Sequence, residues 1–172
     1  MPNQIHHAAS KSTATCYHCG EECREEVLHF DEKEFCCTGC KLVYEVLSEN
    51  ELCNYYQIAE KPGISQKEVS RKDNRFDYLD DTDIVNRLVD FQNGDETHIT
   101  FSIPLIHCAS CIWLLENLHK LHTGVVSGRV DFIKKKVQVK YHQDAISLKE
   151  LVQLLSRIGY EPSINLSDAD KK

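Results

Sequence analysis

Seven of the nine cysteines in this 172-residue chain lie between residues 15 and 57. They fall into closely spaced groups, as metal ligands do, and are not spread evenly along the segment. The seven are Cys16, Cys19, Cys23, Cys36, Cys37, Cys40 and Cys53. So short a segment has little apolar surface to bury, and metal sites of this kind contribute folding energy directly. We therefore expect this segment to fold around a metal ion.

The rest of the sequence favours reduced thiols over a disulfide framework. The cysteine count is odd, and the start of the chain has no apolar run of the kind that a secretory signal requires. No apolar run approaches the ~18–20 residues needed to cross a bilayer. We therefore expect a soluble chain that was not exported and that keeps its thiols reduced in a cytosolic compartment.

Charge and composition indicate the partners and the domain organisation. A net charge of −7 without a basic stripe argues against a nucleic-acid partner held through phosphate contacts. Shifts in composition predict, in order, a disordered lead-in, a cysteine-rich domain, a linker with a short helix, a second domain and a tail. Their predicted bounds are 1–14, 15–57, 58–96, 97–166 and 167–172. In the linker, Thr82 is a candidate N-cap for the short helix.

Two groups of cysteines predict the first metal site. Cys16 and Cys19 form a CxxC pair that reads as a zinc knuckle, with Gly20 free to adopt a positive φ in the turn. A second group, Cys36, Cys37 and Cys40, immediately precedes an amphipathic helical pattern. One pair on a knuckle and one pair at a helix start is the ligand plan of a treble-clef-like zinc site, in which four thiolates satisfy a tetrahedral ion.

Spacing alone leaves the second pair open. Cys36 and Cys40 are four positions apart and Cys37 and Cys40 are three apart, so either pairing is sterically possible. The Cys-x3-Cys form before a helix resembles small metal-sensing treble clefs, which favours Cys36. All five cysteines, the two of the knuckle included, remain candidate ligands for zinc or copper.

The second domain shows the periodicity of an α+β fold. Alternating apolar residues predict strands, and apolar residues at helical spacing predict helices, the second opened by a capping box of Ser147 and Glu150. The predicted order is strand 98–103, helix 108–122, strands 126–132 and 137–141, a second helix stopped by Gly159, and a last strand within 160–166. This β-α-β-β-α-β order is that of ferredoxin-like folds.

A second CxxC motif, Cys108-Ala-Ser-Cys111, opens the first of these helices. The positive end of the helix dipole is expected to favour thiolate over thiol there. Three readings are open: a soft-metal site, a thioredoxin-like redox pair, and two buried cysteines that act as small hydrophobes. Two thiolates on a loop suit Cu(I), which accepts low coordination numbers, so the metal reading is favoured.

Residues 98–166 resemble a heavy-metal-associated domain, the βαββαβ module of copper chaperones and of P1B-type metal-transporting ATPases. The motif cysteines, Gly128 and the Ile-Gly-Tyr sequence that ends in Tyr160 carry the match. The resemblance implies that Cys108 and Cys111 bind Cu(I) on an exposed loop and that Tyr160 packs near the metal. The sequence departs from the family where His107 precedes the motif; it could donate to a thiolate, ligate weakly, or simply face solvent.

Both halves together resemble the N-terminal region of one bacterial subfamily of copper-translocating P1B-type ATPases, linked to haem–copper oxidase assembly. The cysteine-rich segment, the Tyr-Leu-Asp-Asp sequence at 78–81 and Trp113 carry this match. The resemblance implies that the chain lies at the cytoplasmic face of a pump in the bacterial inner membrane. Its partners would be a copper chaperone and the membrane and ATP-binding domains of the same pump. The first site would hold a structural zinc or a second copper, with Cys37 a candidate for handing copper on.

Other readings remain at this stage. The chain has no Asp-Lys-Thr-Gly phosphorylation loop, so we do not expect it to hydrolyse ATP by itself. It could be a free-standing copper chaperone or metal buffer, a thiol oxidoreductase, or a zinc-dependent interaction module. Cys23 and Cys53 are expected to be spare thiols or core residues. Several histidines are expected to face solvent: His6, His7, His119, His122 and His142.

Overall fold

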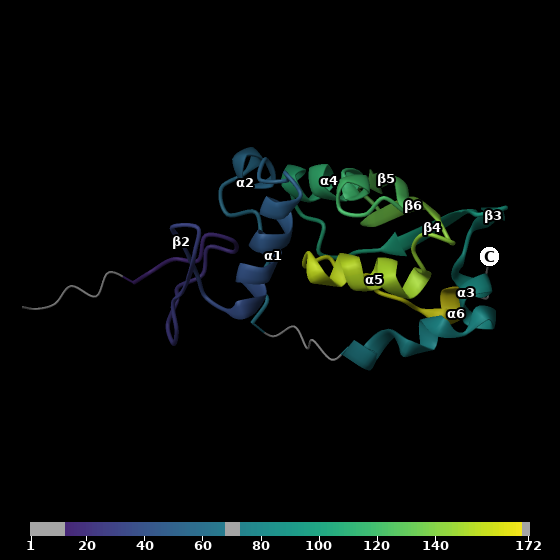
Figure 1. The fold of residues 1–172 in the computed structure, drawn as a ribbon, viewed down its shortest axis with the longest axis horizontal. Coiled ribbons are helices and arrows are strands. Elements are labelled where there is room, and N and C mark those ends of the chain that lie inside the picture. Colours follow the sequence, from purple (N-terminus) through teal and green to yellow (C-terminus); the bar gives the residue numbers. More distant parts are fainter. Residues whose placement is uncertain (1–12, 68–72, 170–172) are drawn as a thin grey trace, which may run out of the picture.

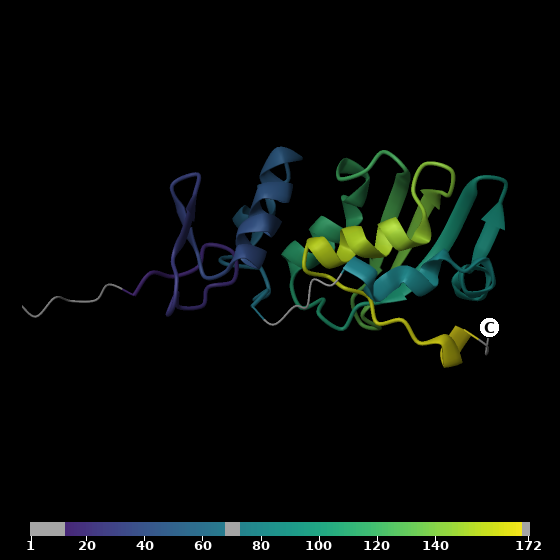
Figure 2. The same ribbon diagram turned by 60° about the horizontal axis from the view of Figure 1, so that its bottom comes forward.

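The computed structural model describes residues 13–67 and 73–169. Most of the predicted lead-in, with His6 and His7, and the last three residues of the predicted tail lie outside these residues. Figures 1 and 2 show the cysteine-rich segment at one end of the molecule and a helix-covered sheet at the other, with helices α1 and α2 between them. The two ends are therefore joined by packed helices.

The first part of the chain contains a knuckle, a hairpin and a helix. Thr15 and Glu22 form an isolated bridge that closes the turn at Gly20, whose φ of 80° confirms the predicted backbone. Strands β1 (Leu28–Phe30) and β2 (Lys33–Phe35) then pair antiparallel. Knuckle, hairpin and helix follow one another in the order that a treble-clef-like site requires.

Helix α1 (Thr38–Glu49) begins directly after the second cysteine group. Cys37 is its N-cap, and its Sγ accepts the backbone N–H of Cys40 at 3.4 Å. The helix buries Val43, Tyr44 and Leu47 on one face. It is followed by the short helix α2 (Tyr55–Ile58).

The segment before the sheet packs against the second domain. It contains the 3₁₀ helix η1 (Asp73–Asp80) and helix α3 (Thr82–Leu88). The predicted N-cap Thr82 was wrong by one residue: Asp81 caps α3, and its carboxylate accepts the N–H groups of Asp83 and Ile84. Lys149 of the second domain bonds two carboxylates of η1, Asp77 at 2.9 Å and Asp80 at 2.6 Å.

The second domain is a four-stranded antiparallel sheet of order β3-β4-β6-β5. Its strands are β3 (Phe91–Asn93), β4 (Glu96–Ser102), β5 (Val125–Asp131) and β6 (Lys136–His142). In β4 and β6 every second residue is buried, as the predicted alternation requires. One face of the sheet is therefore covered, and Figure 2 shows α5 lying across it.

The first predicted helix of this domain and the strand after it differ from the structure. The helix expected over 108–122 is a shorter helix α4 (Ala109–Glu116) followed by the 3₁₀ helix η2 (Leu118–Lys120). The break lies at Asn117, whose side chain bonds the Trp113 carbonyl at 2.7 Å and competes with helical hydrogen bonding. In β5 an irregularity between Val125 and Ser127 shifts the register, so Val125 is buried and Val126 is exposed.

The second helix of the domain agrees with the prediction. Helix α5 (Leu148–Arg157) begins with the expected capping box: the Ser147 hydroxyl accepts from the Glu150 N–H, and the Glu150 carboxylate accepts from the Ser147 N–H. Gly159 follows it with a φ of 90°. Helices commonly end with a residue in this left-handed conformation, which glycine adopts at the lowest energetic cost.

The last predicted strand was wrong. Between 160 and 166 the chain makes a single bridge, with the Ser163 N–H bonded to the Ser102 carbonyl at 2.8 Å, and then forms the short helix α6 (Leu166–Ala169). Strand β3 pairs with the other end of the same edge of β4, at Glu96 to His98. The edge position of the ferredoxin-like order is therefore shared between β3 and this bridge.

One apolar core runs through both parts of the chain. It includes Leu47, Leu52 and Tyr55 from the first part together with Ile106 and Leu114 from the second. A smaller cluster of Cys16, Cys23, Phe35, Cys40 and Tyr44 lies beneath the knuckle. The α+β class and the βαββαβ-like arrangement of the second domain are confirmed.

Candidate metal centres

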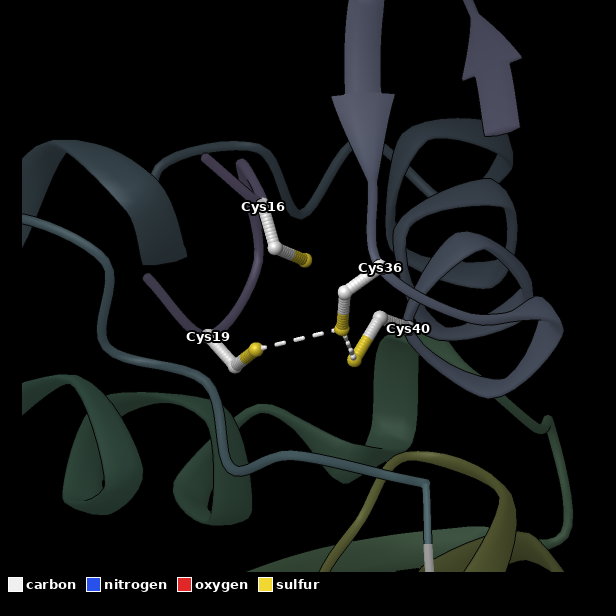
Figure 3. A group of neighbouring side chains, drawn as sticks. All are labelled: Cys16, Cys19, Cys36 and Cys40. Atoms are coloured by element: carbon white, nitrogen blue, oxygen red, sulfur yellow. Dashed lines mark hydrogen bonds between the residues drawn. The ribbon is translucent and has the colours of Figure 1, made fainter. Parts of the chain in front are cut away.

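Four cysteine sulfurs converge in the first part of the chain. Cys16 and Cys19 come from the knuckle, Cys36 follows β2, and Cys40 lies in the first turn of α1. Their Sγ atoms all lie within 4.8 Å of one another. Figure 3 shows the four side chains turned toward a common space.

The spacing of these sulfurs fits a tetrahedral metal ion. Four zinc–sulfur bonds of about 2.3 Å at tetrahedral angles place neighbouring sulfurs ~3.8 Å apart. The Cys19–Cys36 and Cys36–Cys40 sulfurs are 3.6 and 3.8 Å apart. Cys37 is not in this group, because its sulfur caps α1 instead. The structure thus groups Cys36, not Cys37, with the other three.

Without a metal ion, the close packing of these four thiols shifts their pKa values in opposite directions. Hydrogen bonds from Cys19 and Cys40 lower the pKa of Cys16, whereas the interaction with Cys16 raises the pKa of Cys40. Burial is the main cause that raises the pKa of Cys36. Deprotonating all four without a cation would therefore be costly. A bound cation would remove this cost, since thiolates are the form that ligates metal.

His18 supports this site, a role that the sequence analysis did not assign. Its side chain is 1% exposed, its Nδ1 lies 2.8 Å from the Tyr56 hydroxyl, and its ring stacks on Tyr55. Burial lowers the pKa of His18 to about 4, so the imidazole is neutral at pH 7. A Cβ added at Gly63 would lie 2.3 Å from the His18 ring, so only glycine fits there. In the sequence, this role could have been inferred from the position of His18 between Cys16 and Cys19.

The second cysteine pair lies where β4 leads into α4. Cys108 is the N-cap of α4 and half-buried, and Cys111 lies in its first turn and is fully buried. Their sulfurs are 3.2 Å apart. An ion held between them with near-linear geometry needs a larger separation, so loading would require Cys108, the more exposed of the two, to swing outward.

The expected preference for thiolate at Cys108 was wrong. Burial, followed by the hydrogen bond with Cys111, raises the pKa of the Cys108 thiol. These effects outweigh the backbone N–H groups at the start of α4, which act in the opposite direction. A metal ion binding here would therefore displace a proton from this residue.

His107 is positioned as a hydrogen-bond donor. Its Nδ1 lies 2.9 Å from the Leu105 carbonyl oxygen and 3.4 Å from the Cys111 sulfur. A carbonyl oxygen only accepts, so the proton is on Nδ1, and this nitrogen can share it with the sulfur. The geometry favours donation to the sulfur over ligation through the same atom. The imidazole is otherwise exposed.

Two tyrosines stand behind Cys111. Tyr160, which the family resemblance placed near the metal, donates its hydroxyl to the Cys111 sulfur at 3.1 Å. Tyr55, from the first part of the chain, lies 2.7 Å from the Tyr160 hydroxyl. Burial raises the pKa of both phenols, so both keep their protons. Nothing in the sequence indicated Tyr55, because the two residues are separated by 105 positions.

The remaining candidates lie elsewhere. Cys23 is buried in the small cluster beneath the knuckle, and Cys53 is half-buried ahead of α2. His119 is exposed as expected, but two other histidines are half-buried. His122 accepts the Gly124 N–H through Nδ1, and His142 lies 3.2 Å from a carboxylate oxygen of Asp95.

Two family models match the chain. Residues 15–93 match "Putative metal-binding domain of cation transport ATPase", and residues 100–161 match the heavy-metal-associated domain. The chain thus carries a heavy-metal-associated domain preceded by a segment of the kind found in cation transport ATPases. The first match continues beyond the cysteine cluster through η1 and α3, which pack against the second domain.

Individual relatives match over a shorter region. Copper-transporting ATPase 2 from Mus musculus and from Rattus norvegicus are each 33% identical over 57 residues, which is 33% of this chain. The chain spans 4% of the length of these relatives. Among solved structures, oxidised MerP from Ralstonia metallidurans CH34 aligns with a TM-score of 0.37 at 21% identity, covering 41% of this chain and 97% of that one. Within residues 13–67 and 73–169, no helix has the length and apolar character needed to cross a bilayer.

Proposed function

We propose that this chain, with its cation-transport-ATPase segment and heavy-metal-associated domain, is the cytoplasmic metal-binding region of a bacterial Cu(I)-translocating P-type ATPase. The observation that carries the proposal is the pairing of two unlike thiol sites in one chain. One is a compact group of four sulfurs within 4.8 Å, and the other is a two-cysteine site at the start of α4. A chain with a single role for metal would need only one of them.

The second site suits a cargo ion that must be received and passed on. Cys108 is accessible enough to attack an ion held by a donor, and Cys111 can then complete the transfer from its buried position. Two thiolates leave the remaining coordination positions open to the thiols of a partner. Copper would thus move by ligand exchange, from a chaperone to Cys108 and Cys111 and on to the rest of the pump.

The first site suits a resident structural ion. It offers four sulfurs from two chain segments at tetrahedral spacing, and a closed tetrathiolate site of this kind is typical of zinc. Cys16 and Cys40 are fully buried. Zinc there would hold the knuckle against the start of α1, and so would fix the part of the chain that packs on the second domain.

The test is an anaerobic Cu(I) competition titration of the zinc-loaded chain against a chromophoric Cu(I) chelator. We expect C108S/C111S to lose at least about 100-fold in apparent Cu(I) affinity, because both thiolate ligands are gone. C23S/C53S is the matched control, since it also removes two thiols but neither belongs to a group of candidate metal ligands. Unchanged Cu(I) binding in C108S/C111S would refute the proposal. Undetectable Cu(I) binding in the parent chain would also refute the proposal. If, in addition, a Cys108–Cys111 disulfide equilibrated with glutathione, the chain would be a thiol oxidoreductase.

A further inference from the structure

We propose that the first part of the chain helps to build the second metal centre, with Tyr55 acting as a positioning residue for Cys111 through Tyr160. The CxxC motif at the start of α4 is then not a self-sufficient site. Its buried cysteine is held by a hydrogen-bond chain that begins on α2, outside the heavy-metal-associated domain.

The three groups form a continuous buried line. The Tyr55 and Tyr160 hydroxyls are 2.7 Å apart, and the Tyr160 hydroxyl is 3.1 Å from the Cys111 sulfur. Tyr55 and Tyr160 are each 1% exposed and Cys111 is 0% exposed, so water does not compete for these bonds. Hydrogen bonds away from water polarise one another. The Tyr55–Tyr160 bond therefore strengthens the bond from Tyr160 to the Cys111 sulfur.

The sulfur fixes the direction of this chain. A deprotonated or metal-bound cysteine sulfur can only accept a hydrogen bond. Tyr160 has a single hydroxyl proton and gives it to Cys111, so its oxygen must accept from Tyr55. Without Tyr55, the buried Tyr160 oxygen would lose its donor, and the bond to Cys111 would weaken.

The fold of the first part of the chain holds Tyr55 in place. The His18 ring, inside the knuckle, stacks on Tyr55 at a centroid distance of 6.3 Å, and His18 is in turn bonded to Tyr56. A second contact runs in parallel: Gln66 is buried against Gly159, where an added Cβ would lie 2.8 Å from its Nε2. The first part of the chain therefore contacts Tyr160 through Tyr55, and the turn before Tyr160 through Gln66.

The consequence is a link between the two centres. Ordering of the knuckle by its metal would set the position of Tyr55, and Tyr55 would set the donor to Cys111. Outer groups that orient a metal ligand commonly change metal affinity by about 10–100-fold when removed. The metal-dependent part of this inference rests on the proposed function, but the hydrogen-bond chain does not.

The experiment measures the Cys108–Cys111 couple in the metal-free second site of the zinc-loaded chain. The protein dithiol is equilibrated with glutathione, so that one glutathione disulfide is reduced to two glutathione thiols as one protein disulfide forms. Differential alkylation and peptide mass spectrometry then report the oxidised fraction of this pair alone. A donor to Cys111 stabilises the reduced form, so its removal should favour the disulfide.

We expect Y160F to raise the oxidation equilibrium constant about tenfold, equivalent to about 30 mV. Y55F should raise it about two- to fivefold, as the loss of one hydrogen bond in series would. Y141F is the matched control, because the Tyr141 hydroxyl is buried and has no hydrogen-bond partner within the described part of the chain. Native mass spectrometry of each variant verifies that the first site keeps its zinc.

A double variant separates positioning from a general loss of packing. If Tyr55 acts through Tyr160, Y55F/Y160F shifts the equilibrium no further than Y160F alone. Additive shifts, or a Y55F result equal to that of Y141F, would overturn the inference. If the redox shifts appear as expected while Cu(I) fails to bind, the inference stands and the proposed function falls.

Discussion

Gly128 lies at a point where β5 passes close to α4. A Cβ placed there would lie 2.2 Å from the backbone carbonyl oxygen of Leu115, a contact that no side-chain rotation can relieve. Leu115 is one helical turn beyond Cys111, so this close approach also fixes the height of α4 above the sheet. At this position the absence of a side chain is a packing requirement.

G128A should therefore destabilise the chain by more than about 2 kcal/mol, as overpacking against backbone does. Chemical denaturation of the zinc-loaded protein measures this. The control is G94A, where an added Cβ meets nothing within 4 Å but φ is 62°, so the cost is about 1–2 kcal/mol of backbone strain. If G128A costs no more than G94A, the account of this contact is wrong.

At the scale of single residues, the sequence could identify the cysteine pairs but not their environments. Cys36 and Cys37 are neighbours with the same chemistry, and only the start of α1 decides which sulfur turns inward and which caps the helix. The pKa of Cys108 was misjudged because burial of the motif is a property of the packed domain. Tyr55 could not be found because its partner is distant in the sequence.

Helix α5 is the element whose ends are best defined by local chemistry. Ser147 and Glu150 satisfy each other's backbone N–H groups, and these bonds lower the pKa of the Glu150 carboxyl. The sign of the pH effect follows: a carboxyl with a lowered folded pKa contributes stability above its unfolded value of about 4.3. That contribution is lost as the pH falls through the folded pKa.

We expect S147A to destabilise the second domain by about 0.5–2 kcal/mol at pH 7, the usual cost of removing an N-cap. E150Q should flatten the loss of stability between about pH 5 and 3, because glutamine does not titrate there. Thermal unfolding across this pH range checks both. An E150Q profile parallel to that of the parent chain would contradict the assignment of this pH dependence to the capping box.

Elements with a strong periodicity of apolar residues were predicted well, and elements determined by tertiary contacts were not. The strands β4 and β6 alternate cleanly because one face is covered and the other is open. The helix expected over 108–122 stops early because the Asn117 amide takes a backbone carbonyl. The expected last strand is reduced to a bridge at Ser163, with β3 pairing along part of the same edge. Pairing at the edge of a sheet leaves no local pattern of residues in the sequence from which it could be predicted.

At the scale of the whole molecule, the two candidate metal centres are parts of one packed body. Leu47 and Leu52, which follow the first centre in sequence, lie in the same apolar core as Ile106 and Cys111. Composition suggested two separate units because thiols dominate one and periodic apolar residues the other. Composition alone does not reveal whether two such units share a core.

We therefore propose two ions with two different tasks: a resident zinc at the four-cysteine site and an exchangeable Cu(I) at Cys108 and Cys111. Native mass spectrometry of the anaerobic zinc-loaded chain, recorded after one equivalent of Cu(I) and again after a Cu(I) chelator, tests this most directly. We predict one zinc and one copper per chain, with the chelator removing only copper, and no copper retained by C108S/C111S. Loss of zinc as copper enters, or copper retained by C108S/C111S, would contradict the account.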